Sequence, residues 1–422
     1  MLITLGILIV LITVFLLIKQ YENRMVLFCA GLAMALLALN PMAAFKAFSD
    51  AMHESRVFEP IIAVMGFSMV MKVTECDKHL IHFLAKALRK AGPFLIPGAT
   101  VATLAVNTSI TSAAGCSAAV GAILIPLLMS AGVYPAVAAS AVFAGTYAAM
   151  LNPGFAQVTI VADVAKTTPM AVIANHSTTV VICGLIGAFS LAAVAYLRKE
   201  HAGYLPETLK PAEGAAEFKV NLIKAAVPLL PLAILLLGST GAVAAFKQLG
   251  ISHAMIIGVF IAFLVTWKSP ATLSKEFWHG AGDAFGHVFG IITCALVFVG
   301  GLTAIGLVKA LIDAMVSYPH IAKISSAYGP FLLGVLSGSG DAAAVAFNKA
   351  VTVNAAQFGL APINMGSVAA ISGALGRTMS PVAGGAIICA ALAGVNPLEI
   401  TKRNGPGMLI AVVVCLGMLL YL

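Results

Sequence analysis

The sequence predicts an all-α polytopic membrane protein with about ten transmembrane helices and two re-entrant helical hairpins in an inverted repeat. Three observations indicate this fold: the composition, ten apolar runs of membrane-spanning length, and two halves that share motifs. Of 422 residues, 61% are apolar and 9% are Asp, Glu, Lys or Arg, whereas soluble domains carry about 25% charged residues. The mean hydropathy is +1.03. A soluble fold is therefore excluded.

The predicted crossings follow one another along the whole chain. A membrane-spanning helix needs about 20 apolar residues, and such runs occur at 2–18, 25–40, 57–72, 130–162, 170–197, 225–242, 251–267, 285–308, 361–395 and 405–422. The first run has no basic flank and no cleavage site, so we expect a retained span rather than a signal peptide. Amphipathic pieces at 80–90 and 270–283 are expected to lie along the membrane interface.

Two further apolar stretches, 93–129 and 329–358, are too long for one crossing and contain a Ser/Gly-rich break. Each is predicted to enter the membrane and turn back as a hairpin. The spans 130–162 and 361–395 are interrupted as well, by Asn152-Pro153-Gly154 and by Ser380-Pro381. Broken helices at membrane depth are tolerated only where they face protein, water or a ligand. The four breaks are therefore expected to meet near the membrane midplane.

The two halves of the chain repeat these features in register. Gly92-Pro93-Phe94-Leu95 recurs as Gly329-Pro330-Phe331-Leu332, and the motif that begins at Ser112 recurs 225 residues later at Ser337. We expect a first repeat at 1–197, a cytoplasmic linker at 198–224 and a second repeat at 225–422. Each half has five predicted crossings, so the second half would be inverted, as in secondary transporters.

The basic residues predict the orientation. Sixteen Lys and Arg residues fall on one side of the ten crossings and six on the other, and the richer side faces the cytoplasm. Both termini are then predicted to be periplasmic. The net charge of +8 is explained by this orientation, so membrane lipid and not nucleic acid is the expected partner.

Polar residues at the breaks are the candidate site. For substrate binding we select Arg377, Thr378, Ser380, Ser112, Gly115, Ser117, Asn152, Ser337, Gly338, Ser339 and Gly340. For a coupling ion we select Asp341, Asn107, Thr108 and Ser109. Helix N-termini at such breaks favour anions, and unwound carbonyls can hold a cation. The alternatives are packing kinks for the Pro and Gly residues and helix–helix hydrogen bonding for the hydroxyl and amide groups.

Arg377 and Lys349 are the two basic residues left at membrane depth. The guanidinium of Arg377 can pair bidentately with a carboxylate, and an unpaired structural arginine there would be costly. Asp341 could take a coupling proton, help to hold Na⁺ or pair with Arg377. A purely structural Arg377–Asp341 ion pair is the alternative.

No motif indicates enzyme chemistry. The sequence contains no Gly-rich phosphate loop, no Ser/His/Asp order and no metal-ligand spacing, and its seven cysteines are scattered without a C-x-x-C pair. We expect neither a catalytic residue nor a metal or cofactor, beyond a coupling H⁺ or Na⁺.

The segment Leu375-Gly376-Arg377-Thr378-Met379-Ser380-Pro381-Val382, followed by residues 397–403, resembles the DcuC family of anaerobic C4-dicarboxylate carriers, within the wider ion transporter superfamily. The resemblance extends through residues 337–340 and 112–115. It implies a bacterial inner-membrane carrier for succinate, fumarate, malate or aspartate, often used for succinate efflux in anaerobic metabolism. It also implies an elevator mechanism, in which a transport part holding both hairpins moves against a scaffold, and frequently a homodimer.

Coupling stays open at this point. Sodium-coupled relatives carry Ser-Asn-Thr at both hairpin tips, whereas this chain has Asn107-Thr108-Ser109 and Ser337-Gly338-Ser339-Gly340-Asp341. Exchange and H⁺- or Na⁺-coupled symport or efflux are all compatible with these tips. A cation/proton antiporter of the same superfamily is the nearest alternative, and a non-transport membrane scaffold subunit, which would not need four breaks in register, is the more distant one.

Overall fold

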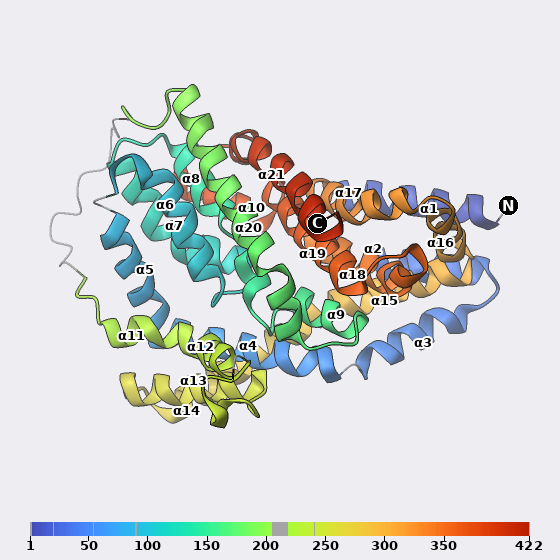
Figure 1. Ribbon diagram of the computed structural model, residues 1–422, viewed down its shortest axis with the longest axis horizontal. Coiled ribbons are helices and arrows are strands. Elements are labelled where there is room, and N and C mark those ends of the chain that lie inside the picture. Colours follow the sequence, from blue (N-terminus) through green and yellow to red (C-terminus); the bar gives the residue numbers. More distant parts are fainter. Residues whose placement is uncertain are drawn as a thin grey trace.

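The computed structural model describes residues 2–19, 21–53, 55–88, 91–204, 218–239 and 241–421. In this part of the chain all regular structure is helical (Figure 1). Five helical runs there are long and apolar enough to cross a membrane: Ala113–Ser130, Pro169–Leu197, Leu222–Ser239, Pro270–Ala304 and Pro397–Leu420. The protein is thus an all-helical, multi-span membrane protein. The central part of the predicted linker 198–224 lies outside the described residues.

One group of helices comes from the start of each half. In the first half these are α1 (Leu2–Ile18), α2 (Asn23–Leu37), α3 (Pro41–Met52), α4 (Ser55–Thr74) and α5 (Cys76–Leu88). In the second half they are α11 (Leu222–Ala226), α12 (Leu230–Ser239), α13 (Ile251–Thr266), α14 (Pro270–Asp283), α15 (Gly290–Ala304) and α16 (Leu307–Ser317). The halves are interleaved, because α15 packs on α2 and α3 while α4 packs on α13 and α14.

The second group contains the hairpins and the broken spans. Its first-half members are α6 (Leu95–Asn107), α7 (Ala113–Ser130), α8 (Pro135–Ala144), α9 (Ala156–Val164) and α10 (Pro169–Leu197). Its second-half members are α17 (Pro319–Ser337), α18 (Gly340–Ala350), α19 (Pro362–Thr378), α20 (Gly384–Ala393) and α21 (Pro397–Leu420). Five of these helices start at prolines, where the missing N–H costs nothing. Chain breaks therefore fall where the repeated motifs predict them.

Two boundaries differ from the sequence-based expectation. Helix α17 begins ten residues before position 329 and carries Pro330 in its interior. The pieces predicted separately at 270–283 and 285–308 are joined, because a π-helical turn, Ala284–Phe289, connects α14 to α15. Glycines and a π-turn absorb the local irregularity without ending the helix. Residues 270–304 therefore form one continuous helical run.

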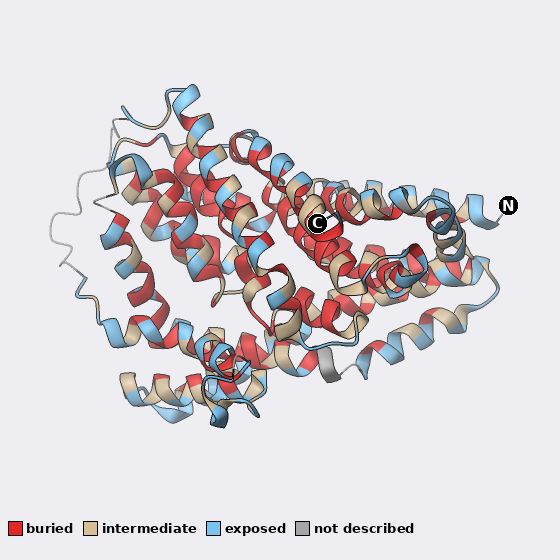
Figure 2. Cartoon of the chain, in the orientation of Figure 1, coloured by how far each residue is buried: buried red, intermediate tan, exposed pale blue. Residues whose placement is uncertain are grey.

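The contacts of this second group are nearly unchanged when the halves are exchanged. The pairs α6–α8 and α7–α8 correspond to α17–α19 and α18–α19, and the pairs α7–α20 and α8–α20 correspond to α18–α9 and α19–α9. Helices α10 and α21, which correspond to each other, also pack together. The buried residues concentrate on these helices, whereas α1 exposes a row of large apolar side chains (Figure 2).

Contacts between the two groups do not follow this correspondence throughout. Helix α15 packs along α18, whereas its counterpart α4 makes at most a minor contact with α7. A cavity lies between α4 and α7 instead, because residues of both helices line it. The cavity therefore separates α4 from α7, whereas α15 and α18 are in contact.

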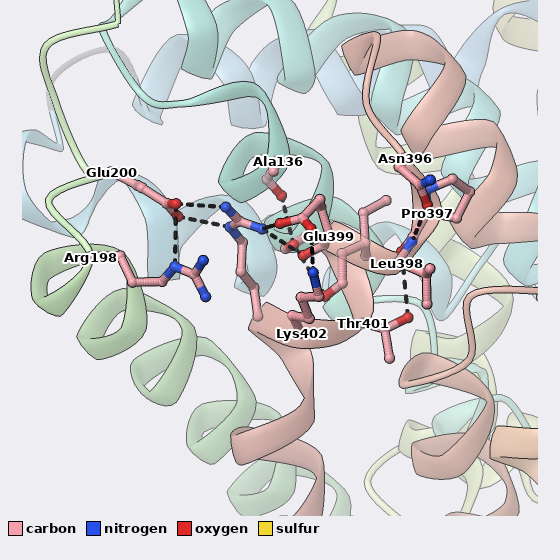
Figure 3. Close-up of polar contacts among 12 residues, drawn as sticks. Ala136, Arg198, Glu200, Asn396, Pro397, Leu398, Glu399, Thr401 and Lys402 are labelled. Atoms are coloured by element: carbon pink, nitrogen blue, oxygen red, sulfur yellow. Dashed lines mark hydrogen bonds and ion pairs between the residues drawn. The ribbon is translucent and has the colours of Figure 1, made fainter.

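A polar cluster joins the end of α10 to the start of α21 (Figure 3). The buried guanidinium of Arg403 donates to both carboxylate oxygens of Glu200, at 2.8 and 2.6 Å. Its Nη1 donates to the carboxylate of Glu399 at 2.7 Å. Arg198 and Lys402 contact the same two carboxylates from the outside. The Arg403 cluster thus ties the end of the first half to the last helix of the second.

Candidate functional site

A cavity of about 1060 Å³ opens among the breaks of both halves. Four helices begin at its wall: α7 at Ala113, α9 at Ala156, α18 at Gly340 and α20 at Gly384. The amino ends of α9 and α20 have no side-chain cap. Each helix amino end carries about half a positive charge and offers free N–H groups to an anion. The cavity therefore has a positive wall without a cluster of basic side chains.

Arg377 reaches the cavity from the last turn of α19. Its Nη2 donates to the backbone carbonyl of Thr146 at 2.8 Å. Its Nη1 is buried and has no hydrogen-bond partner in the described part of the chain. An unsatisfied buried donor is rare and costs about 1–3 kcal/mol, more when it is charged. One face of this guanidinium is thus held in place while the other is left unpaired.

Asp341 lines the same cavity from the first turn of α18. Among the ion pairs of the described residues, none joins Asp341 to Arg377. The structural ion pair considered from the sequence is therefore not formed in this structure. Lys349, the other basic residue at membrane depth, pairs with Asp163 at 2.8 Å and does not line the cavity.

Gln157 also lines the cavity, although the sequence did not single it out. It lies in the first turn of α9, directly after the Asn152-Pro153-Gly154 break, and is fully buried. Its Nε2 donates to the backbone carbonyl of Asp341 at 3.0 Å, while its Oε1 has no partner in the described part of the chain. The one available signal was an amide side chain immediately after a predicted break.

Only four of the residues selected from the sequence are part of the cavity lining: Arg377, Asp341, Ser112 and Gly115. Ser112 caps α7, because its Oγ accepts from the N–H of Gly115 at 3.2 Å. The other selected residues are not part of this lining: Asn107, Thr108, Ser109, Ser117, Asn152, Ser337, Gly338, Ser339, Gly340, Thr378 and Ser380.

In the first half, two asparagines tie the hairpin tip to the broken span. The Oδ1 of Asn107 accepts from the N–H of Ala149 at 2.8 Å, and the Nδ2 of Asn152 donates to the carbonyl of Thr108 at 2.8 Å. The remaining polar atoms of both amides bond to nearby backbone groups. Both asparagine side chains are therefore used in hydrogen bonds to backbone groups, which fasten the hairpin tip to the broken span.

The hydroxyl groups at this tip are also used, with one exception. Thr108 donates to the carbonyl of Ala105 at 2.7 Å, and Ser109 donates to the carbonyl of Pro228, in the other half, at 3.0 Å. Ser117 is buried against Gly385, and its Oγ has no partner among the described residues.

In the second half, the tip packs directly on the broken span. Gly338 adopts a φ of +71°, and a Cβ there would press against the backbone of Ala383 at 2.9 Å. The Oγ of Ser337 accepts from the N–H of Ser339, and Thr378 donates to the carbonyl of Ala374. The Oγ of Ser380 accepts from the N–H of Val382 at 3.4 Å. These hydroxyl groups stabilise the break from within.

The part of the cavity that α4 and α5 line carries mixed charge. Lys72, Asp77 and Lys78 line it, together with His82, whose ring stacks on Phe218 at 4.1 Å between centroids. Burial raises the pKa of the Asp77 carboxyl, against the opposing hydrogen bond from the N–H of Lys78. The negative charge that Asp77 presents to an incoming anion therefore weakens as the pH falls.

Comparisons with known proteins identify the family of this chain. The model of the DcuC family, described as C4-dicarboxylate anaerobic carrier, matches residues 47–422. An uncharacterized transporter of Haemophilus influenzae is 38% identical over 271 residues, which cover 62% of this chain and 97% of that protein. The anaerobic C4-dicarboxylate transporter DcuC of Escherichia coli is 26% identical over 375 residues, or 84% of this chain and 78% of that protein.

A solved structure shares the fold. MtrF of Neisseria gonorrhoeae, from a class of antimetabolite efflux pumps, superposes with a TM-score of 0.66 at 12% sequence identity. The match covers 90% of this chain and 82% of MtrF. At this identity the likeness concerns the fold alone.

Proposed function

This chain belongs to the DcuC family of C4-dicarboxylate anaerobic carriers, and we propose that it is a secondary active transporter of C4-dicarboxylates in the bacterial inner membrane. The family consists of transporters and not of enzymes, which also excludes a scaffold subunit without transport activity. The observation that carries the proposal is the unpaired Nη1 of Arg377 in the cavity among four helix amino ends.

Arg377 would bind one carboxylate of the substrate. Its guanidinium is oriented by the bond from Nη2 to Thr146, so Nη1 is available for a charge-assisted hydrogen bond. The free N–H groups at the start of α20, on Gly384 and Gly385, and the amino end of α7 would receive the other carboxylate. A dianion suits a site with one cationic side chain and several helix dipoles.

Asp341 is our proposed site for a coupling proton. It lies at membrane depth beside the substrate cavity, where a carboxylate without a paired cation is costly and favours proton uptake. A Na⁺ site built from Asn107, Thr108 and Ser109 is less well supported, because these side chains already bond to the backbone. Exchange of one dicarboxylate for another remains compatible with the same cavity.

Alternating access would follow an elevator movement between two inverted repeats, 1–197 and 225–422, with ten crossings and two re-entrant hairpins. The transport part would comprise α6–α10 and α17–α21, and the remaining helices would form the scaffold. Support comes from the correspondence of contacts within the second group of helices and from the unequal contacts of α4 and α15 with that group. Lys72 and Lys78 line the cavity and belong to the side of the membrane that is predicted to carry sixteen of the Lys and Arg residues. The cavity of this structure would therefore open to the cytoplasm, with both termini periplasmic. We also propose a homodimer, as the family resemblance implies.

Counterflow in proteoliposomes tests the proposal. Vesicles loaded with unlabelled succinate or malate should accumulate labelled succinate or malate transiently from outside, and larger tricarboxylates should not compete. Varying Na⁺ and pH in the same assay separates the coupling ions. If no C4 acid is exchanged, and a Na⁺ gradient instead moves protons without any organic anion, the cation/proton antiporter is the correct alternative.

A further inference from the structure

Two residues that line the cavity each carry a buried polar atom with no hydrogen-bond partner among the described residues, and the two atoms have opposite hydrogen-bonding character. Arg377 Nη1 is a charged donor, and Gln157 Oε1 is a neutral acceptor. The two residues come from different halves of the chain, from the end of α19 and the start of α9. Buried groups of this kind are normally paired. The cavity is therefore suited to a ligand that offers an acceptor to Arg377 and a donor to Gln157.

The orientation of the Gln157 amide is determined by its other end. Its Nε2 donates to the carbonyl oxygen of Asp341 at 3.0 Å, a partner that accepts only. The amide oxygen must then be the unpaired atom, and an exchange of N and O would place two acceptors face to face. Helices α18 and α19 both pack on α9, which holds this side chain in place.

Resting on the proposed function, we propose that Gln157 selects C4-dicarboxylates that carry a hydrogen-bond donor on carbon 2, either a hydroxyl or an ammonium group. A carboxylate of the substrate would pair with Arg377 Nη1, and the neighbouring donor would bond to Gln157 Oε1. The carboxyl of Asp341 on the same wall would attract an ammonium group more strongly than a hydroxyl. Succinate and fumarate, which have no such donor, would leave Gln157 Oε1 buried and unpaired.

Discrimination of this type is strong in principle. A site built to bond a substrate O–H or N–H rejects the analogue that lacks it, because its own buried group is then left without a partner. We expect malate (hydroxyl), aspartate (ammonium) or both to compete at least about tenfold better than succinate. The comparison of malate with aspartate shows whether the preferred donor is a hydroxyl or an ammonium group.

The experiment measures half-inhibitory concentrations of unlabelled malate, aspartate and succinate against counterflow of labelled malate in proteoliposomes. The ratio of the half-inhibitory concentration of succinate to that of malate or aspartate, measured on the wild type, tests the proposed selectivity. Gln157→Met tests whether Gln157 causes it, since Met has a similar volume and no acceptor of comparable strength. Thr159→Val is the matched control, because the Thr159 hydroxyl is buried on the same helix and bonds only to the carbonyl of Ala156.

Gln157→Met should weaken competition by the donor-bearing acid about tenfold and leave succinate nearly unchanged, and Thr159→Val should keep the wild-type ratio. A wild type that binds succinate as well as malate and aspartate overturns the inference while leaving the proposed function intact. A Gln157→Met protein in which competition by malate, aspartate and succinate weakens equally also overturns the inference. If none of the three acids is exchanged, the proposed function itself fails.

Discussion

Gly340 and Gly373 allow α18 and α19 to approach until their backbones touch. A Cβ on Gly340 would overlap the carbonyl oxygen of Gly373, and a Cβ on Gly334 of α17 would lie 2.6 Å from the same oxygen. Small residues at helix crossings serve this purpose in membrane proteins, where packing drives association. The geometry of the second hairpin tip, and with it the position of Asp341, therefore depends on single glycines.

Gly340→Ala should destabilise the protein and reduce transport. The added methyl group meets backbone atoms that cannot rotate away, so α18 must shift, at a cost of about 1–3 kcal/mol. The unfolding temperature of the purified protein in detergent measures this cost. Gly417→Ala on α21 is the control, since a Cβ there meets nothing within 4 Å. An equal loss of stability in both variants would show that close packing on α19 does not require a glycine at position 340.

The residues of the site were only partly predictable. Arg377 and Asp341 stood out because charges in apolar segments are rare, and Ser112 because it begins the motif that recurs at Ser337. Gln157 acquires its role from Asp341, which is 184 residues away along the chain. The asparagines selected as ligands bond instead to backbone groups that only tertiary structure brings near.

The Arg403 cluster joins helices α10 and α21 through ion pairs that are largely buried. The Arg403 side chain is 6% exposed and its partner Glu200 14% exposed, so the pair is shielded from water. Breaking a buried ion pair by removing one partner costs about 3–5 kcal/mol, because the other charge is stranded. The cluster therefore anchors α21 to the end of α10.

Arg403→Ala should lower the free energy of unfolding by an amount near the lower end of that range, since Glu399 is one-third exposed. Arg198→Ala is a matched control, because Arg198 contacts the same Glu200 at 3.3 Å but is 45% exposed. Its loss should cost less than about 1 kcal/mol. Denaturation in detergent compares the two variants, and similar losses would show that burial does not decide the contribution.

The ends of elements were well predicted where the cause is local. The repeated prolines 135, 169, 362 and 397 each begin a helix. The early start of α17 and the fusion of α14 with α15 were missed, because a Pro or Gly inside a helix is tolerated when neighbouring helices support it. Sequence alone does not show that support.

The proposed elevator movement requires a second state of the molecule, because α15 packs on α18 here while the cavity separates α4 from α7. In that state α7 would close on α4 while α18 leaves α15. Ile292 of α15 and Val345 of α18 belong to one buried cluster here. Cysteines at directly contacting positions of α15 and α18 within this cluster, in a background without the native cysteines, should cross-link and stop transport, and reduction should restore it.

The control keeps the native Cys183 and Cys415 instead, which neighbour each other on α10 and α21 within the proposed transport part. A cross-link there should leave transport largely intact, because these helices would move together. Full transport with α15 joined to α18 would contradict a movement between the two parts. The measurement in both cases is counterflow before and after reduction, with cross-linking followed by mass spectrometry.

Counterflow of labelled C4-dicarboxylate by Arg377→Lys in proteoliposomes tests our proposal that Arg377 binds a carboxylate of the transported substrate. Lysine keeps the charge but loses the planar fork that bonds Thr146 and the substrate together. Losing one charge-assisted hydrogen bond of about 1.5–3 kcal/mol should raise the half-saturating concentration roughly 10- to 100-fold. Wild-type exchange by an equally stable, equally inserted Arg377→Lys protein would contradict the claim.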